Sequence, residues 1–240
     1  MSTGKIALIT GANKGIGKET AKQLAALGFT VLIGARDVAQ GQAAADEVGH
    51  GAKAISLDVN REESIKAAAA QVEAEYGHLD ILINNAGVKL GGYGQASTDI
   101  PTDEWRKTFE TNLFGVIDVT RAFLPLLKKS EAGRIVNLSS ILGSITLHAD
   151  PKSPIYNSKP AAYDVSKSAL NAFTVHLAFD LKDTAIKANA AHPGWVKTDM
   201  GGESAPMEIV DGAKTSVALA TLPADGPTGG FFHLGKPLPW

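Results

Sequence analysis

The stretch from Lys5 to Gly17 constrains the fold more than any other part of the sequence. Its apolar run, Ile6 to Ile9, is typical of a strand that is buried on both faces. The glycine-rich turn Thr10–Gly17 follows at once, and residues 18–28 then carry apolar side chains at helical spacing. A buried strand, a glycine turn and a helix in this order predict a parallel α/β sheet with a phosphate-binding turn at its edge.

The three glycines of the turn have separate tasks. Gly11 lets the chain reverse tightly, Gly15 lets the backbone approach a pyrophosphate, and Gly17 lets the helix pack close to the strand. We also expect Asn13 and Ile16, within the same turn, to contact a cofactor whose phosphates bind there. The spacing is G-x-x-x-G-x-G rather than the commoner G-x-G-x-x-G, and an ordinary strand-to-helix turn also uses glycine. The rest of the chain therefore has to decide between the two interpretations.

Length and composition predict one domain that spans residues 1–240. Alternating strands and helices predict a Rossmann-type, doubly wound parallel sheet of about seven strands with helices on both faces. The net charge of −2 gives no general attraction to nucleic acid or to an anionic membrane, so we expect neither as a partner. Without cysteine, with scattered histidines and with no long apolar segment, the chain is expected to be cytoplasmic and to hold no metal.

The end of the second strand predicts which dinucleotide binds. Residues 30–35 form a buried strand that ends at Arg36, about 20 residues beyond the glycine turn. A guanidinium at this point can hold the 2′-phosphate of NADP, and Lys14 adds a second cation nearby. The alternative is a solvated arginine that Asp37 neutralises.

Two further strands end in polar or small residues at the same edge of the predicted sheet. Asp58 and Val59 close a strand over residues 52–59, where ligands of open α/β sheets gather. The strand at residues 79–83 ends in Asn84–Gly87, whose amides need partners and whose small residues leave room for a flat ligand. A purely structural turn is the alternative for this segment.

The second half of the chain carries the candidate catalytic residues. A long helix over residues 101–123 contains Asn112, an unfavourable residue for a helix interior. A strand at residues 134–138 delivers Ser139 and Ser140, and a helix from about Ala161 carries Tyr163 and Lys167. Because these last two are four residues apart, they lie on one face of the helix.

Together these motifs resemble the short-chain dehydrogenase/reductase family, and particularly its NADPH-dependent carbonyl reductases. The resemblance covers nearly the entire chain through Thr10–Gly17, Asn84–Gly87, Asn112, Ser139–Ser140, Tyr163–Lys167 and Pro193–Thr198. The segment Ala35–Asp37 and the ending near Trp240 are more similar to carbonyl reductases than to NAD-selective members.

The resemblance implies a role for each candidate catalytic residue. Tyr163 protonates a carbonyl oxygen while NADPH delivers hydride to the carbonyl carbon. A free tyrosine, with a pKa of about 10, exchanges protons slowly at neutral pH, so Lys167 is expected to stabilise the ionised form and to hold the nicotinamide ribose. Ser140 orients and polarises the carbonyl, with Ser139 as its rival. Asn112 holds a water that connects to Lys167.

The resemblance also implies which residues line the cofactor. They are Asn85, Ala86, Gly87, Tyr163, Lys167, Pro193, Gly194, Val196 and Thr198. The chain departs from the family in one respect, because Ser140 and Tyr163 are 23 residues apart rather than roughly a dozen. Monomeric carbonyl reductases have a larger insertion here, so this intermediate length leaves both a monomer and a homo-oligomer open.

Three segments are expected to shape the substrate pocket, namely 88–100, 141–160 and 199–210. Trp195 either adds an aromatic wall to this pocket or packs into the core. The first functional hypothesis is an NADPH-dependent reductase of a small-molecule aldehyde or ketone, reversible as an alcohol dehydrogenase. A non-catalytic NADP(H) sensor is the second, and a lyase or epimerase on the same fold is the third, disfavoured because no larger C-terminal substrate domain is evident.

Overall fold

Eight strands form one sheet in the order β3-β2-β1-β4-β5-β6-β7-β8. The computed structural model describes residues 4–92 and 94–240, so Tyr93 of the expected loop 88–100 lies outside the described residues. Seven strands run parallel, and β8 pairs antiparallel with β7. The order reverses between β1 and β4, which places a ligand crevice at the carboxyl edge next to the glycine turn.

The strands are short and mostly buried. Their bounds are β1 Ile6–Thr10, β2 Thr30–Ala35, β3 Lys53–Ser56, β4 Ile81–Asn84, β5 Arg134–Leu138, β6 Lys187–Ala191, β7 Phe231–His233 and β8 Lys236–Pro237. The helices are α1 Gly15–Ala26, α2 Val38–Val48, α3 Glu62–Tyr76, α4 Thr102–Phe109, α5 Gly115–Leu127, α6 Ile145–Ala149, α7 Ala161–Asp180, α8 Ile209–Gly212 and α9 Lys214–Ala220. Two 3₁₀ turns, η1 Ser97–Asp99 and η3 Ile141–Gly143, and one π-helical turn, η2 Glu110–Phe114, complete the described elements.

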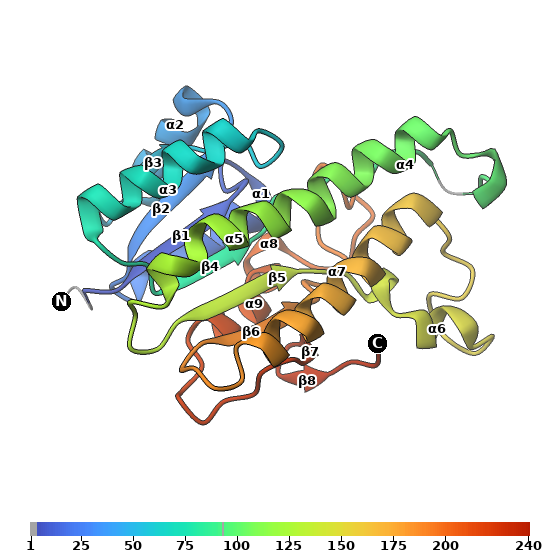
Figure 1. Cartoon of the computed structure of the whole chain (residues 1–240). Helices are drawn as coiled ribbons and strands as arrows, with labels where there is room; N and C mark the ends of the chain where they lie inside the picture. Colours follow the sequence, from blue (N-terminus) through green and yellow to red (C-terminus); the bar gives the residue numbers. More distant parts are fainter. Residues whose placement is uncertain (1–3, 93) are drawn as a thin grey trace.

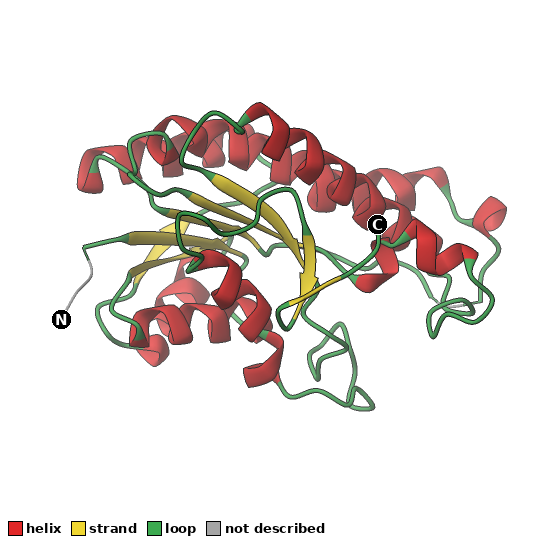
Figure 2. Ribbon diagram, turned by 90° about the horizontal axis from the view of Figure 1, so that it is seen from below, coloured by secondary structure: helices red, strands yellow, loops and turns green. Residues whose placement is uncertain are grey.

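The sheet lies between two helical layers, which Figure 2 shows above and below the strands. On one face, α3, α5 and α7 pack residues such as Ile65 and Phe123 against Leu8 of β1. On the other face, α1, α2 and α9 pack residues such as Leu24 against Ile9. Neighbouring residues of one strand thus enter opposite cores, which is why the parallel strands are apolar throughout.

This architecture confirms the predicted fold class, with eight strands instead of about seven. The additional strand, β8, follows a tight turn in which Leu234 and Gly235 have φ values of 46° and 78°. Two consecutive positive φ values match the twist of an antiparallel hairpin. Because Leu-Gly lacks the usual Asn-Gly or Asp-Gly signal, the sequence gives little warning of this hairpin.

The segment 141–160 has more structure than its sequence predicts. It begins with η3, which Ser140 caps, and continues into the short helix α6, which Ser144 caps through the N–H of Leu147 at 3.2 Å. In Figure 1, α6 and the outer end of α4 extend past the carboxyl edge of the sheet. No helix in the described part of the chain is long and apolar enough to span a membrane.

Candidate active site

The glycine turn and the segment after β4 are built against each other. The side-chain amide of Asn85 donates to the carbonyls of Thr10 and Gly11 at 2.8 and 3.1 Å. In return, the hydroxyl of Thr10 accepts the N–H groups of Asn85 and Ala86, both at 3.0 Å. A methyl group on Gly17 would stand 2.4 Å from the Asn85 amide nitrogen, so only glycine fits there. Asn85 therefore holds the shape of the turn.

The N-terminus of α1 offers a place for an anion. The helix begins at Gly15, and no side chain caps it. Gly11 and Gly15 have φ values of 62° and 57°, a region that favours glycine. The methyl of Thr198 lies 3.7 Å from the position that a Cβ on Gly15 would occupy, so a distant segment faces the turn. Exposed helix N–H groups beside a bare backbone fit a pyrophosphate.

Arg36 follows β2 and is exposed at the same edge. Its neighbour Asp37 caps α2, accepting the N–H groups of Ala39 and Gln40 at 2.9 and 3.1 Å. The carboxylate that sequence reasoning offered as a neutralising partner for Arg36 is thus engaged by the helix. The exposed guanidinium of Arg36 stands next to the turn, so its position fits an additional phosphate.

Two other residues of the turn have partners in the structure. Lys14 pairs with Asp199 at 2.6 Å, which connects the turn to the segment 199–210. Asn13 donates to the side chain of Gln40 on α2 at 2.9 Å. Both sites are exposed, so a ligand can compete for these side chains at small cost.

Asp58 and Val59 lie beyond the strand that was predicted to contain them, because β3 ends at Ser56. The Asp58 carboxylate accepts the N–H of Asn60 at 3.0 Å and so forms a local turn that stops the strand. Val59 is buried in the core below α5. Both residues remain at the carboxyl edge, as expected.

Tyr163 and Lys167 are buried on one face of α7. The Lys167 Nζ lies 5.7 Å from the centroid of the Tyr163 ring and donates to the carbonyl of Leu138 at 2.7 Å. The same Nζ lies 3.6 Å from the place where a Cβ on Gly87 would stand. Burial lowers the pKa of Lys167 to about 8. This face of α7 therefore brings a cation and a phenol to the end of β4 and β5.

Asn112 lies in the π-helical turn η2, between α4 and α5. Its amide nitrogen donates to the carbonyl of Val88 and to the hydroxyl of Ser166, and its oxygen accepts the N–H of Val88 at 2.8 Å. The side chain of Asn112 thus makes two reciprocal hydrogen bonds with the backbone of Val88, in the segment after β4. These bonds explain why asparagine is found inside a helix. Single π-turns of this kind are frequent at functional sites.

The two serines after β5 have different surroundings. The Ser139 hydroxyl is buried and donates to Asn171 at 2.6 Å. The Ser140 hydroxyl accepts the N–H of Leu142 at 3.2 Å, which leaves its own proton available for another acceptor. This difference favours Ser140 over Ser139 as the residue that orients a substrate.

The segment after β6 folds back over the edge of the sheet. Val196 is buried and forms a parallel bridge with Met207, while Lys197 donates its N–H to the Met207 carbonyl at 2.9 Å. Trp195 is 56% exposed and donates its indole N–H to the carbonyl of Gly201 at 2.8 Å. The alternative in which Trp195 packs into the core is therefore wrong.

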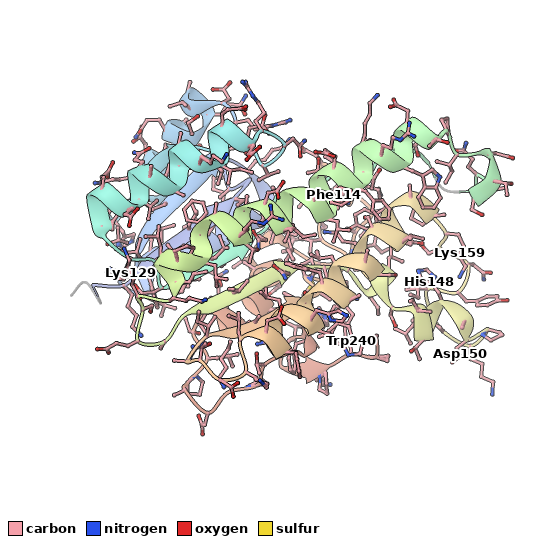
Figure 3. All side chains as sticks on the ribbon, viewed as in Figure 1. Phe114, Lys129, His148, Asp150, Lys159 and Trp240 are labelled. Carbon is pink, nitrogen blue, oxygen red and sulfur yellow. The ribbon has the colours of Figure 1, made fainter. Side chains whose placement is uncertain are left out.

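The insertion 141–160 is bonded to α7, the helix that carries Tyr163 and Lys167. Lys159, which lies near His148 in Figure 3, donates to Nδ1 of His148 at 2.9 Å. The other ring nitrogen of His148 lies 2.8 Å from the Leu142 carbonyl and 3.3 Å from Asp164. Asp164 follows Tyr163 directly, and its burial raises the pKa of that carboxyl to about 7. The insertion is thus fixed next to Tyr163, although its sequence gives few structural signals.

A hollow of about 740 Å³ opens on another side of α7. Its lining includes Gln95 to Thr98, Lys159, Ala161 and Val165. At 100° per residue, positions 161 and 165 lie nearly opposite Tyr163 and Lys167 on the helix. The hollow is therefore separate from the catalytic face, even though it joins two of the expected substrate loops.

Sequence reasoning missed several residues that support the site. The hydroxyl of Thr10 accepts the backbone N–H of Asn85, and the hydroxyl of Ser166 accepts the side-chain amide of Asn112. Asn171 accepts from the Ser139 hydroxyl and donates to the carbonyl of Gly143. Their partners lie far away in the chain, so no local pattern marks them. For Thr10, its position at the last residue of β1 was the available signal.

A glycine turn at the switch point of a doubly wound sheet and a buried Tyr-x-x-x-Lys pair, which both lie against the segment after β4, define a class of nucleotide-dependent oxidoreductases. The short chain dehydrogenase family model matches residues 5–209, and the chain belongs to this family.

Individual proteins and solved structures of this family are similar to the chain over most of its length. The NADPH carbonyl reductase 1 of Homo sapiens is 34% identical, with 96% of this chain and 97% of the relative covered. The short-chain dehydrogenase anuI of Penicillium roqueforti is 38% identical, with 91% and 89% covered. The NADPH-bound carbonyl reductase from chicken fatty liver has a TM-score of 0.86 at 30% identity over all of both chains. Salutaridine reductase from Papaver somniferum gives 0.82 at 29% identity, with 95% of this chain and 99% of that chain covered.

Proposed function

We propose that this protein reduces an aldehyde or ketone to an alcohol with NADPH. The observation that carries the proposal is the buried pair on α7, where the Lys167 Nζ lies 5.7 Å from the Tyr163 ring at the carboxyl edge of the sheet. Relatives that are named NADPH carbonyl reductases, and a similar structure with NADPH bound, support this choice of cofactor and reaction.

Four parts of the site fit NADPH. The glycines and the uncapped N-terminus of α1 suit its pyrophosphate, and exposed Arg36, together with Lys14, suits the 2′-phosphate. Ala86 and Gly87 provide a flat wall, and the segment from Pro193 to Thr198 reaches the glycine turn, where the methyl of Thr198 faces Gly15. The remaining positions in the turn and beside it, namely Asn13, Ile16, Asp58, Val59 and Asn85, complete the proposed cofactor contacts.

When bound, NADPH supplies the hydride that reduces the carbonyl carbon. Tyr163 Oη donates its proton to the carbonyl oxygen as that oxygen gains negative charge. The Lys167 ammonium favours the resulting phenolate, because an opposite charge nearby stabilises the ionised form. Ser140 donates a hydrogen bond to the same oxygen and fixes its direction. Asn112 and Lys167 then connect Tyr163 to solvent through a water, which restores the phenol.

A panel of aldehydes and ketones, assayed with NADPH and NADH in parallel, tests the reaction and the cofactor choice together. We expect NADPH oxidation with at least one carbonyl class and a preference for NADPH. In Tyr163→Phe, kcat should fall by about 10²- to 10⁴-fold, the usual contribution of a positioned proton donor. Its dissociation constant for NADPH, measured by cofactor fluorescence, should stay within about threefold of wild type, since binding does not need the proton.

Equal turnover by wild type and Tyr163→Phe would contradict the proposed mechanism. Tight NADPH binding without turnover across the panel would instead favour a non-catalytic sensor.

A further inference from the structure

The backbone ladder between β5 and β6 stops just short of the catalytic residues. Its last bond joins the N–H of Ser139 to the carbonyl of Ala191 at 2.8 Å. Beyond this bond the two strands pair no further: the chain after β5 continues through Ser140 into η3, and the chain after β6 continues into the segment 193–198, which is proposed to line the cofactor. No backbone pairing of these two strands therefore sets the distance between Ser140, the proposed carbonyl donor, and the segment 193–198.

The side chain of His192 bridges this divergence. Its Nδ1 accepts the N–H of Ile141 at 3.1 Å, and the N–H of Gly194 lies 3.4 Å from the same nitrogen. Ile141 directly follows Ser140, and Gly194 belongs to the segment that faces the glycine turn. One ring nitrogen thus joins the two segments that the ladder leaves apart.

The ring of His192 is itself held firmly. The backbone N–H of His192 donates to the carbonyl of Phe232 at 2.8 Å, and its carbonyl lies 2.9 Å from Nδ1 of His233. The two imidazole rings also pack together, with centroids 4.8 Å apart. Because both the backbone and the ring are fixed from β7, the ring keeps its direction toward Ile141.

The protonation state of His192 suits an acceptor. A nitrogen that accepts two N–H groups carries no proton, so the imidazole proton is on Nε2. Burial, with a smaller effect of His233, lowers the pKa of His192 to about 3. The ring is therefore neutral around pH 7. A buried, neutral ring of this kind is a poor proton donor for a substrate.

We propose that His192 is a positioning residue that fixes the turn after Ser140 relative to the segment 193–198, and so sets how carbonyl and nicotinamide meet. The inference rests on the proposed reductase function. Displacing reacting groups by about 1 Å can cost roughly 100-fold in rate, so one additional connection at this point has a large effect.

Three substitutions at His192 test the proposal. His192→Leu removes the acceptor nitrogen, so the N–H groups of Ile141 and Gly194 lose this hydrogen-bond partner. His192→Asn places a carbonyl oxygen close to the position of Nδ1, whereas His192→Gln moves that oxygen one methylene further out. His176→Leu, on the exposed face of α7, is the matched control for a histidine-to-leucine change. Each variant is assayed for kcat per cofactor-binding site, for NADPH affinity, and, without cofactor, for amide exchange at Ile141 and Gly194.

We expect His192→Leu to lower kcat by about 10- to 100-fold while NADPH affinity changes by less than about threefold, because the phosphates bind elsewhere. His192→Asn should recover kcat to within about threefold of wild type, and His192→Gln should not. Amide exchange at Ile141 and Gly194 should become faster in the Leu and Gln variants and stay slow in the Asn variant and the control. If His192→Leu does not fold, the comparison of Asn with Gln decides the question.

Unchanged kcat in His192→Leu, or equal losses in the Asn and Gln variants, would overturn the proposal and leave a structural role only. Unchanged amide exchange in every variant would also overturn it. If wild type reduces no carbonyl at all, the proposed function fails and the catalytic part of this inference fails with it, while the amide exchange still decides whether His192 joins the two segments.

Discussion

The two ends of the proposed cofactor site are built in different ways. The phosphate end is mainly backbone, made of a glycine turn and the N-terminus of α1, and Asn85 holds its shape through carbonyl groups. The catalytic end is mainly side chains, with Tyr163 and Lys167 projecting from α7 toward β4 and β5. A single added methyl group can therefore disrupt phosphate binding at the first end, whereas the loss of a single polar atom can disrupt catalysis at the second.

At the phosphate end, Gly17→Ala is expected to lower both the affinity for NADPH and the stability of the fold. The new methyl would stand 2.4 Å from the Asn85 amide nitrogen and 3.0 Å from Cα of Ala12, so the turn must shift. Overpacking of this kind costs about 1–3 kcal/mol, which corresponds to NADPH binding weaker by about 5- to 150-fold if the shift falls on the turn. Fluorescence titration measures the affinity, and thermal unfolding should show a lower midpoint.

Gly92→Ala is the control for that change, because a Cβ at Gly92 meets nothing within 4 Å. Normal NADPH affinity in Gly17→Ala would contradict the view that the phosphate end depends on close backbone packing.

Arg36→Leu tests the side chain that is proposed, together with Lys14, to hold the 2′-phosphate at the phosphate end. Hydrogen bonds to charged groups contribute about 1.5–3 kcal/mol, so NADPH affinity should fall by about 10- to 150-fold, while NADH affinity stays the same. Arg106→Leu, an exposed arginine on α4, is the control. An equal loss for both cofactors would argue against recognition of the 2′-phosphate by Arg36.

The catalytic end should depend on pH through Lys167. Burial lowers the pKa of Lys167 to about 8, so its charge is present below that pH and is lost above it. Without the ammonium the phenolate of Tyr163 is less stable, and kcat/KM for NADPH should fall toward a limit of about tenfold per pH unit above pH 8. In Lys167→Arg the guanidinium stays charged, so this decline should shift to higher pH even if the rate is lower. The same midpoint in both proteins would assign the decline to another group.

The smallest effect is expected from Asp199→Asn. Asp199 pairs with Lys14 at 2.6 Å on an exposed surface, and Lys14 holds the pKa of that carboxyl below its usual value. Exposed pairs contribute little, so releasing Lys14 should tighten NADPH binding only slightly, by less than about fivefold at low salt. The gain should shrink as salt is added. Weaker binding in Asp199→Asn would indicate that Asp199 helps to hold the cofactor.

Much of the fold could be predicted because its signals are local. The strand that delivers Ser139 begins and ends at the predicted residues, Arg134 and Leu138, and α7 begins at Ala161 as expected. Two elements were not predicted, because their local sequence carries no clear signal. The β7–β8 hairpin turns at Leu234 and Gly235 without the usual turn residues, and α6 is only five residues long.

The sequence by itself determined which residues follow each strand, where glycine exposes the backbone to a ligand, and that Tyr163 and Lys167 share one helix face. Each of these features follows from chain geometry over a few residues. Only the tertiary structure decided which partners those residues have. Asn85 binds the carbonyls of the glycine turn from 74 and 75 residues away, and His192 binds the N–H of Ile141 from 51 residues away. Such bonds depend on which strands become neighbours in the sheet, and no local pattern records that choice.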